Sequence, residues 1–163
     1  MKVLSAPLGG LLGAILGGVL WALYIKWTGN RWGFIAVGIG ATTGLGIVLS
    51  GSQGIDVSDK KRWIMLSIGA AFFSIIGIYI GKFLDVQWNA VTQLAEMMVQ
   101  EYNMTMEQAL PSAKVQISGY SRWELMKDRM DWYDALFVCV AAITAFYLTY
   151  HPRLRKLISN IYK

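Results

Sequence analysis

Residues 7–50 read PLGGLLGAILGGVLWALYIKWTGNRWGFIAVGIGATTGLGIVLS, two glycine-rich apolar arms joined by a short polar turn. The first arm carries no charge over residues 7–25, and the second carries none over residues 32–50. At about 1.5 Å of rise per residue, each arm as a helix reaches most of the way across a hydrocarbon layer of roughly 30 Å. The stretch therefore predicts a hairpin of two membrane-spanning helices, at about residues 7–26 and 32–50.

Small residues recur at four-residue spacing along both arms and again in a later apolar segment. Helices gain little hydrophobic free energy by associating inside lipid, so they rely on the close backbone approach that such ridges permit. We expect these ridges to pack helices within one chain; association of copies along a free ridge and a pore lined by glycine backbone are the alternatives. The predicted packing positions are Gly9, Gly13, Gly17, Gly40, Gly44, Gly77 and Gly81.

The composition agrees with a membrane protein. Of 163 residues, 55% are hydrophobic and only 15% are charged, whereas a soluble domain carries about 25% charged residues. Lys2 precedes the first apolar run as in a signal peptide, but the run is too long and no small-residue cleavage site follows it. We interpret this run as a retained first span.

Two further spans are predicted at residues 63–83 and 131–150, which gives an all-α, four-helix integral membrane protein. Lys82 lies near the end of the third span, where a lysine is expected to snorkel. Four spans place both termini and the loop 51–62 on one side, which holds eight cations and two acids. The other side holds the turn of the hairpin, residues 84–130 and the adjoining span ends, with seven cations and eight acids in all. Cations favour the cytoplasmic side. The basic tail 151–163 is thus predicted to be cytoplasmic, like the amino terminus, and the basic excess indicates topology rather than nucleic-acid binding.

The outer segment, residues 84–130, is too polar to span a membrane. Apolar and polar residues alternate with a helical period over residues 86–103, which predicts an amphipathic helix that docks on the bundle or on a partner. The methionines gathered in the outer segment fit either role. The predicted partner interface on this helix consists of Trp88, Val91, Leu94, Met98 and Tyr102.

The rest of the outer segment is predicted from its turn signals. Pro111 is expected to end a short helical turn, and residues 112–120 are expected to form a loop. Ser121 and Glu124 have the spacing of a capping box, so a helix is predicted to begin there. This helix either continues into the fourth span or bends near Asp131.

Few side chains are candidates for catalysis or for binding a metal or cofactor. Asp131 and Asp134 lie in the first turn of the fourth span, where carboxylates cap a helix; an ion pair with a partner or an ion site is the alternative. Cys139 is expected to be a buried, inert thiol, and His151 is the only histidine. The spans carry no ionisable residue near their middle, and no phosphate loop or zinc-protease helix occurs. We predict no catalytic residue, no metal and no cofactor.

The sequence resembles a recurrent group of small, uncharacterised bacterial multi-span proteins. Residues 13–22 (GAILGGVLWA), the turn and residues 33–41 (GFIAVGIGA) are similar to a hairpin of the form GALIGAxxWAxIxxxTGYExGxxAxGIGxxxG. Residues 134–146 (DALFVCVAAITAF) resemble a final span of the form DLLFxxLAxxTA. The chain departs from the pattern at residues 30–32, where the turn usually carries a tyrosine and an acid. The resemblance implies four spans in a bacterial cytoplasmic (inner) membrane, and no activity.

The sequence as a whole predicts a non-catalytic structural or accessory membrane protein. We expect its partners to be the lipid bilayer and another membrane protein or a second copy of the chain. The alternative is a small homo-oligomeric channel or transporter.

Overall fold

The computed structural model describes residues 5–29, 33–51, 58–128 and 130–161. All regular structure in these ranges is helical, and the helices are α1 (Ser5–Thr28), α2 (Phe34–Gly51), α3 (Lys60–Tyr102), α4 (Met106–Ser118), α5 (Arg122–Asp128), α6 (Trp132–Tyr150) and α7 (Pro152–Ile161). Four of them, α1, α2, α3 and α6, are long and apolar enough to cross a membrane. The predicted all-α fold with four spans is confirmed.

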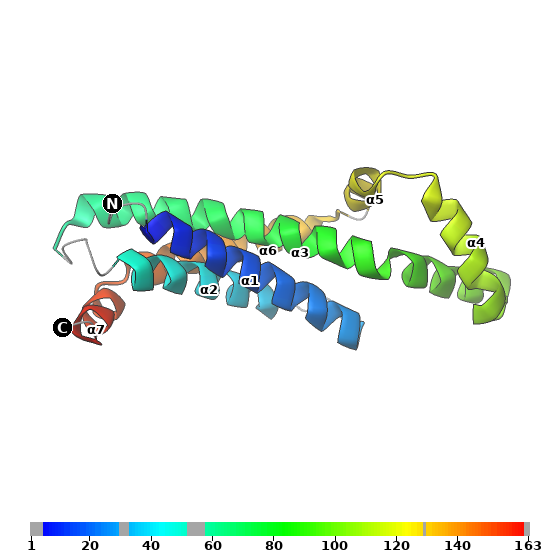
Figure 1. Ribbon diagram of the computed structural model, residues 1–163, viewed down its shortest axis with the longest axis horizontal. Helices are drawn as coiled ribbons and strands as arrows, with labels where there is room; N and C mark the ends of the chain where they lie inside the picture. The colour runs from blue at the N-terminus through cyan, green and yellow to red at the C-terminus, as the bar shows by residue number, and fades with distance from the viewer. Residues whose placement is uncertain (1–4, 30–32, 52–57, 129, 162–163) are drawn as a thin grey trace.

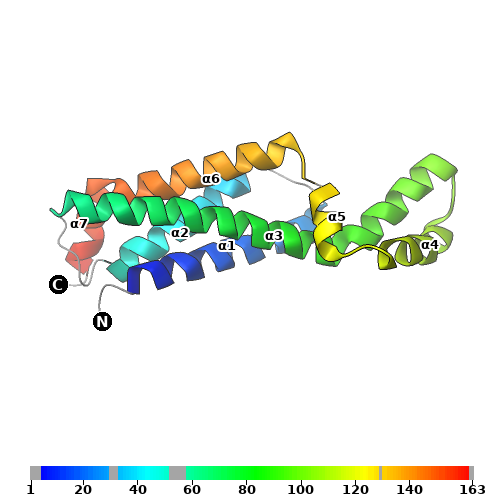
Figure 2. The same ribbon diagram turned by 90° about the horizontal axis from the view of Figure 1, so that it is seen from above.

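The four long helices form an antiparallel bundle (Figure 1). Both α1 and α6 contact α2 and α3, and Figure 2 shows them on opposite sides of the bundle with α3 between them. The start of α1 and the helix α7 lie at one end, which we call the terminal end. At the other end α3 runs on beyond the bundle and α4 packs back along it; we call this the hairpin end.

The helices of the bundle approach closely because glycines stand at their crossings. A Cβ atom at Gly13 would collide with the Thr42 carbonyl of α2, one at Gly18 with the Gly77 carbonyl of α3, and one at Gly40 with the Ala141 carbonyl of α6. A larger side chain at these points would push the backbones apart. The predicted packing glycines all face a neighbour: Gly9, Gly13 and Gly17 face α2, Gly40 and Gly44 face α6, and Gly77 and Gly81 face α1.

The third span and the predicted amphipathic helix form one uninterrupted helix, α3, of 43 residues. Asp59 caps its start by accepting a hydrogen bond from the Arg62 N–H at 3.2 Å, and Asn103 ends it in the left-handed conformation with φ of 51°. No glycine or proline stands between Lys82 and Asn103, so nothing in the sequence breaks the helix. Its length of about 65 Å is roughly twice the thickness of the hydrocarbon layer, and Figure 2 shows its course turning just beyond α5.

The predicted loop at residues 112–120 is wrong, because α4 continues through Pro111 to Ser118. The helix starts with the Thr105 N–H donating to the Gln108 side chain at 3.2 Å. Proline removes one backbone donor and disfavours helix in the residue before it. Packing outweighs that loss: the buried residues Ala109, Ala113 and Ile117 recur every four residues and lie against α3.

The tail at the terminal end forms the short helix α7. Its Leu154 packs beside Val48 and Trp63, and the guanidinium of Arg155 lies 4.9 Å from the centre of the Trp63 ring and 5.8 Å from that of Tyr150. A guanidinium over aromatic rings is favoured electrostatically. The sequence analysis counted Arg155 among the cations that favour the cytoplasmic side. The side chain is only 4% exposed, and its contacts hold α7 against the bundle.

Candidate functional site

A buried ion pair joins α3 to α6 near the hairpin end of the bundle. The Lys82 Nζ lies 2.6 Å from Asp134 Oδ2, and the two residues are 3% and 6% exposed. The predicted snorkelling of Lys82 is therefore wrong. The surroundings of the pair include Ile78, Tyr79 and Val138, and a charge in such apolar surroundings is retained when it finds an opposite charge with good geometry.

Asp134 also caps α6, so the two roles that the sequence left as alternatives occur together. The Asp134 N–H donates to Asp131 Oδ1 at 3.1 Å, and the Asp131 N–H donates to Asp134 Oδ2 at 3.1 Å. This reciprocal arrangement is a capping box, which satisfies two backbone donors at the start of a helix. The same Oδ2 that accepts from Lys82 thereby fixes the first turn of α6.

Polar side chains continue along α3 beyond Lys82. Asp85 is fully buried, and its Oδ1 accepts a hydrogen bond from the Asn89 Nδ2 at 2.9 Å. Sequence reasoning assigned Lys82 to snorkelling and missed Asp85, because it ended the span at Phe83. The sequence did offer a signal for this polar group. Lys82 and Asp85 have opposite charges at three-residue spacing and are followed by Asn89, and residues so spaced share one face of a helix.

The predicted partner interface lies only partly on the surface. Val91, Leu94 and Met98 pack against the buried alanines that α3 and α4 share, whereas Trp88 is 37% and Tyr102 is 64% exposed. The Lys26 Nζ lies 5.4 Å from the centre of the Trp88 ring, which links the end of α1 to α3. Most of the predicted face is thus an internal contact of the α3–α4 hairpin.

The predicted capping box at Ser121 is confirmed, and it starts α5. The Ser121 N–H donates to Glu124 Oε2 at 2.8 Å, and the Glu124 N–H donates to Ser121 Oγ at 3.2 Å. Met126 is 1% exposed and packs with Val86, Ala90 and Ile117. α5 ends at Asp128 and α6 begins at Trp132, so of the two alternatives the break near Asp131 is the one found.

Hydrogen bonds to the Glu124 carboxylate from the Ser121 backbone and side chain, helped by the charge of Lys127, hold the pKa of Glu124 below its ordinary value. A depressed carboxylate pKa stabilises α5 above the pKa of the unfolded chain, and this stabilisation disappears as the pH falls through the folded-state pKa. We expect Ser121→Ala to raise the pKa of Glu124 part of the way, because the backbone donor remains. A carbon-13 NMR titration of the Glu124 carboxyl in detergent micelles measures the shift; an unchanged midpoint in Ser121→Ala would show that the Ser121 hydroxyl does not stabilise the Glu124 carboxylate.

The two remaining candidate residues lie away from the ion pair. His151 ends α6, where its N–H donates to the Tyr147 carbonyl at 2.9 Å and its ring lies 5.2 Å from the Tyr147 ring. Cys139 is exposed on α6, so the prediction that it is buried is wrong. Comparison of the chain with known protein families, with characterised proteins and with solved structures gives no match.

Proposed function

We propose that the chain is a non-catalytic structural or accessory protein of a bacterial cytoplasmic membrane, with both termini in the cytoplasm, which presents the α3–α4 hairpin to a partner membrane protein. The observation that carries this proposal is the hairpin itself: it projects from the bundle on an uninterrupted helix and has its own apolar contacts between α3 and α4. A surface that is ordered before binding loses little conformational entropy on association.

Exposed apolar side chains on the hairpin support a role in binding. Met97 and Tyr102 on α3 and Val115 on α4 are 51%, 64% and 74% exposed. Outside the membrane such side chains face water, and aromatic residues and methionine are enriched at protein interfaces. α4 covers Val91, Leu94 and Met98 of the predicted interface. The exposed residues therefore form the surface that the experiment changes.

The experiment is a pull-down from native membranes in mild detergent, with partners quantified by mass spectrometry. We expect a stoichiometric partner whose recovery falls about tenfold in the double variant Tyr102→Ser, Val115→Ser, as for removal of interface anchors. The matched control, Glu101→Ser with Lys114→Ser, changes the exposed neighbours of the same two positions and is expected to retain the partner. A partner kept by both variants, or no partner at all, would overturn the proposal.

A small homo-oligomeric channel or transporter is the second proposal, and one observation bears on where its copies would meet. Of the glycines on the described spans, Gly38 and Gly69 have no atom of another helix near the position of a Cβ. The packing glycines face helices of the same chain, so association through glycine would use these two positions. Solute flux in liposomes that Gly38→Leu abolishes, with the monomer fold intact, would support this second function.

A further inference from the structure

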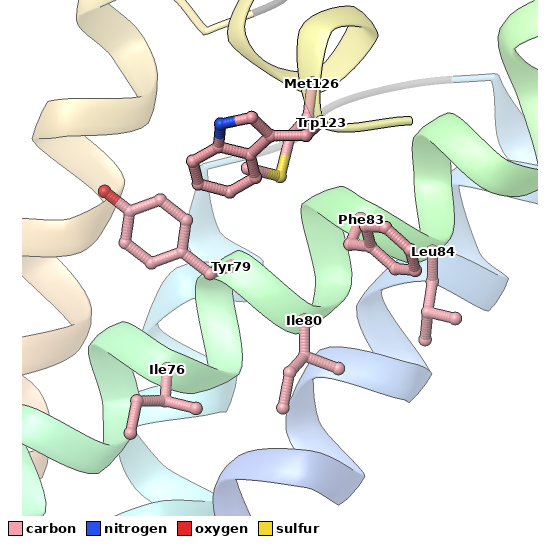
Figure 3. Close-up of a pocket in the computed structure, with 7 residues that line it drawn as sticks. All are labelled: Ile76, Tyr79, Ile80, Phe83, Leu84, Trp123 and Met126. Carbon is pink, nitrogen blue, oxygen red and sulfur yellow. The ribbon is translucent and has the colours of Figure 1, made fainter. Parts of the chain in front are cut away.

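An apolar groove lies between α3 and α5 at the hairpin end of the bundle (Figure 3). Its volume of about 410 Å³ falls within the roughly 300–1,000 Å³ range of small-molecule sites. In Figure 3 the Trp123 indole lies above the Tyr79 ring, and the α3 side chains continue the wall below and to the side. The lining residues are Ile76, Tyr79, Ile80, Phe83, Leu84, Trp123 and Met126.

The groove opens on the outer face of a membrane-spanning helix. Tyr79, Phe83 and Trp123 are 40%, 43% and 56% exposed. Counted from Trp63, where the apolar part of α3 begins, Phe83 lies about 30 Å along the helix, at the edge of the hydrocarbon layer. Acyl chains surround the protein at this level, so an acyl chain is the chemistry that reaches an apolar groove there.

Cations stand beside the groove, on the wall that α5 forms. The Lys127 Nζ lies 5.6 Å from the centre of the Trp123 ring. At 3.6 residues per turn, Arg122 and Lys127 point about 70° to either side of the direction shared by Trp123 and Met126, while Glu124 and Asp128 point about 130° and 170° from it. Lys127 also lies near Glu124, since its charge helps to lower the pKa of that carboxyl. Glu124 is moreover bound to Ser121. An apolar groove with two cations at its rim complements an acyl chain that carries an anionic headgroup.

We propose that the α3–α5 groove holds one acyl chain of an anionic phospholipid, whose phosphate contacts Lys127 at the rim, with Arg122 as the second cation. The α5 helix is then the element that selects the lipid: its Trp123 and Met126 contact the chain, and its cations contact the headgroup. This site is separate from the exposed hairpin surface offered to a partner, and the two proposals stand or fall independently.

Native mass spectrometry of the purified full-length protein tests the proposal, with phosphatidylglycerol or phosphatidylcholine of identical acyl chains as the probe. We expect one phosphatidylglycerol to be retained by the wild type and lost in Ile80→Trp, which fills the groove. The matched control is Ile68→Trp, at a 59% exposed position of the same helix outside the groove; it is expected to retain the lipid. Size-exclusion chromatography confirms that both variants remain folded.

The headgroup is tested without touching the groove. We expect Arg122→Gln with Lys127→Gln to reduce the preference for phosphatidylglycerol over phosphatidylcholine by at least about fivefold, the equivalent of about 1 kcal/mol for one interfacial cation. Lys114→Gln on α4 is the control and is expected to leave the preference unchanged. Three results would overturn the proposal: equal retention of the two lipids by the wild type, retention unaffected by Ile80→Trp, or a second copy of the chain or an uncharged lipid in place of the phospholipid.

Discussion

Asp134→Ala is expected to lower the free energy of unfolding by about 3–5 kcal/mol, the range found when one partner of a buried ion pair is removed. The variant leaves the Lys82 ammonium buried beside Ile78, Tyr79 and Val138 without the carboxylate at 2.6 Å. It also removes the acceptor for the Asp131 N–H at the start of α6. Titration with sodium dodecyl sulfate in mixed micelles, followed by circular dichroism, measures the change.

A double variant separates the charge from the cap. Lys82→Met with Asp134→Asn removes both charges but keeps a side-chain oxygen that accepts from the Asp131 N–H. Replacing a whole buried pair by neutral groups is often close to neutral, so this variant is expected to recover most of the stability that Asp134→Ala loses. Wild-type stability in Lys82→Met alone, or no recovery in the double variant, would show that the ion pair does not hold α3 against α6.

The second large effect is expected at Gly40, where Gly40→Leu should lower the free energy of unfolding by about 2–3 kcal/mol. A Cβ at this position collides with the Ala141 carbonyl and lies 2.9 Å from the Thr144 Cβ, so α2 and α6 must move apart. The same unfolding titration applies.

Gly38→Leu is the matched control, two residues away on the same helix. No atom lies within 4 Å of a Cβ built at Gly38, and the change is expected to stay within about 0.5 kcal/mol or to stabilise slightly through helix propensity. Equal losses in the two variants would contradict the described crossing of α2 and α6. The two variants also improve the test of a channel. Loss of flux in Gly40→Leu would indicate damage to the fold of one chain, whereas loss of flux in Gly38→Leu would indicate that copies associate at Gly38.

The spans were predictable because their signals are local. Charge-free apolar runs and glycines at four-residue spacing are visible in any short window, and the packing glycines that these signals identified all lie at helix crossings. The capping box of Ser121 and Glu124 is local in the same way, and it too was found from spacing alone.

The errors arose where a distant residue decides the outcome. Lys82 looked like a snorkelling lysine because its partner, Asp134, lies 52 positions away in the sequence. Pro111 looked like a helix end because the gain that offsets it, burial of Ala109 and Ala113 against α3, depends on tertiary packing. The apolar stripe predicted as a partner face is present, but Val91, Leu94 and Met98 of it pack against α4.

The continuity of α3 has a mechanical consequence. No residue from Lys60 to Tyr102 leaves the helical conformation, so α3 connects the span to α4 without a loop, although its course turns beyond α5. A rotation of the span about its own axis by one residue, about 100°, therefore moves the hairpin sideways, because the end of α3 points away from that axis. A partner that binds the hairpin therefore also restrains the span. A change in the tilt of the bundle, imposed by the bilayer, displaces the tip of the hairpin.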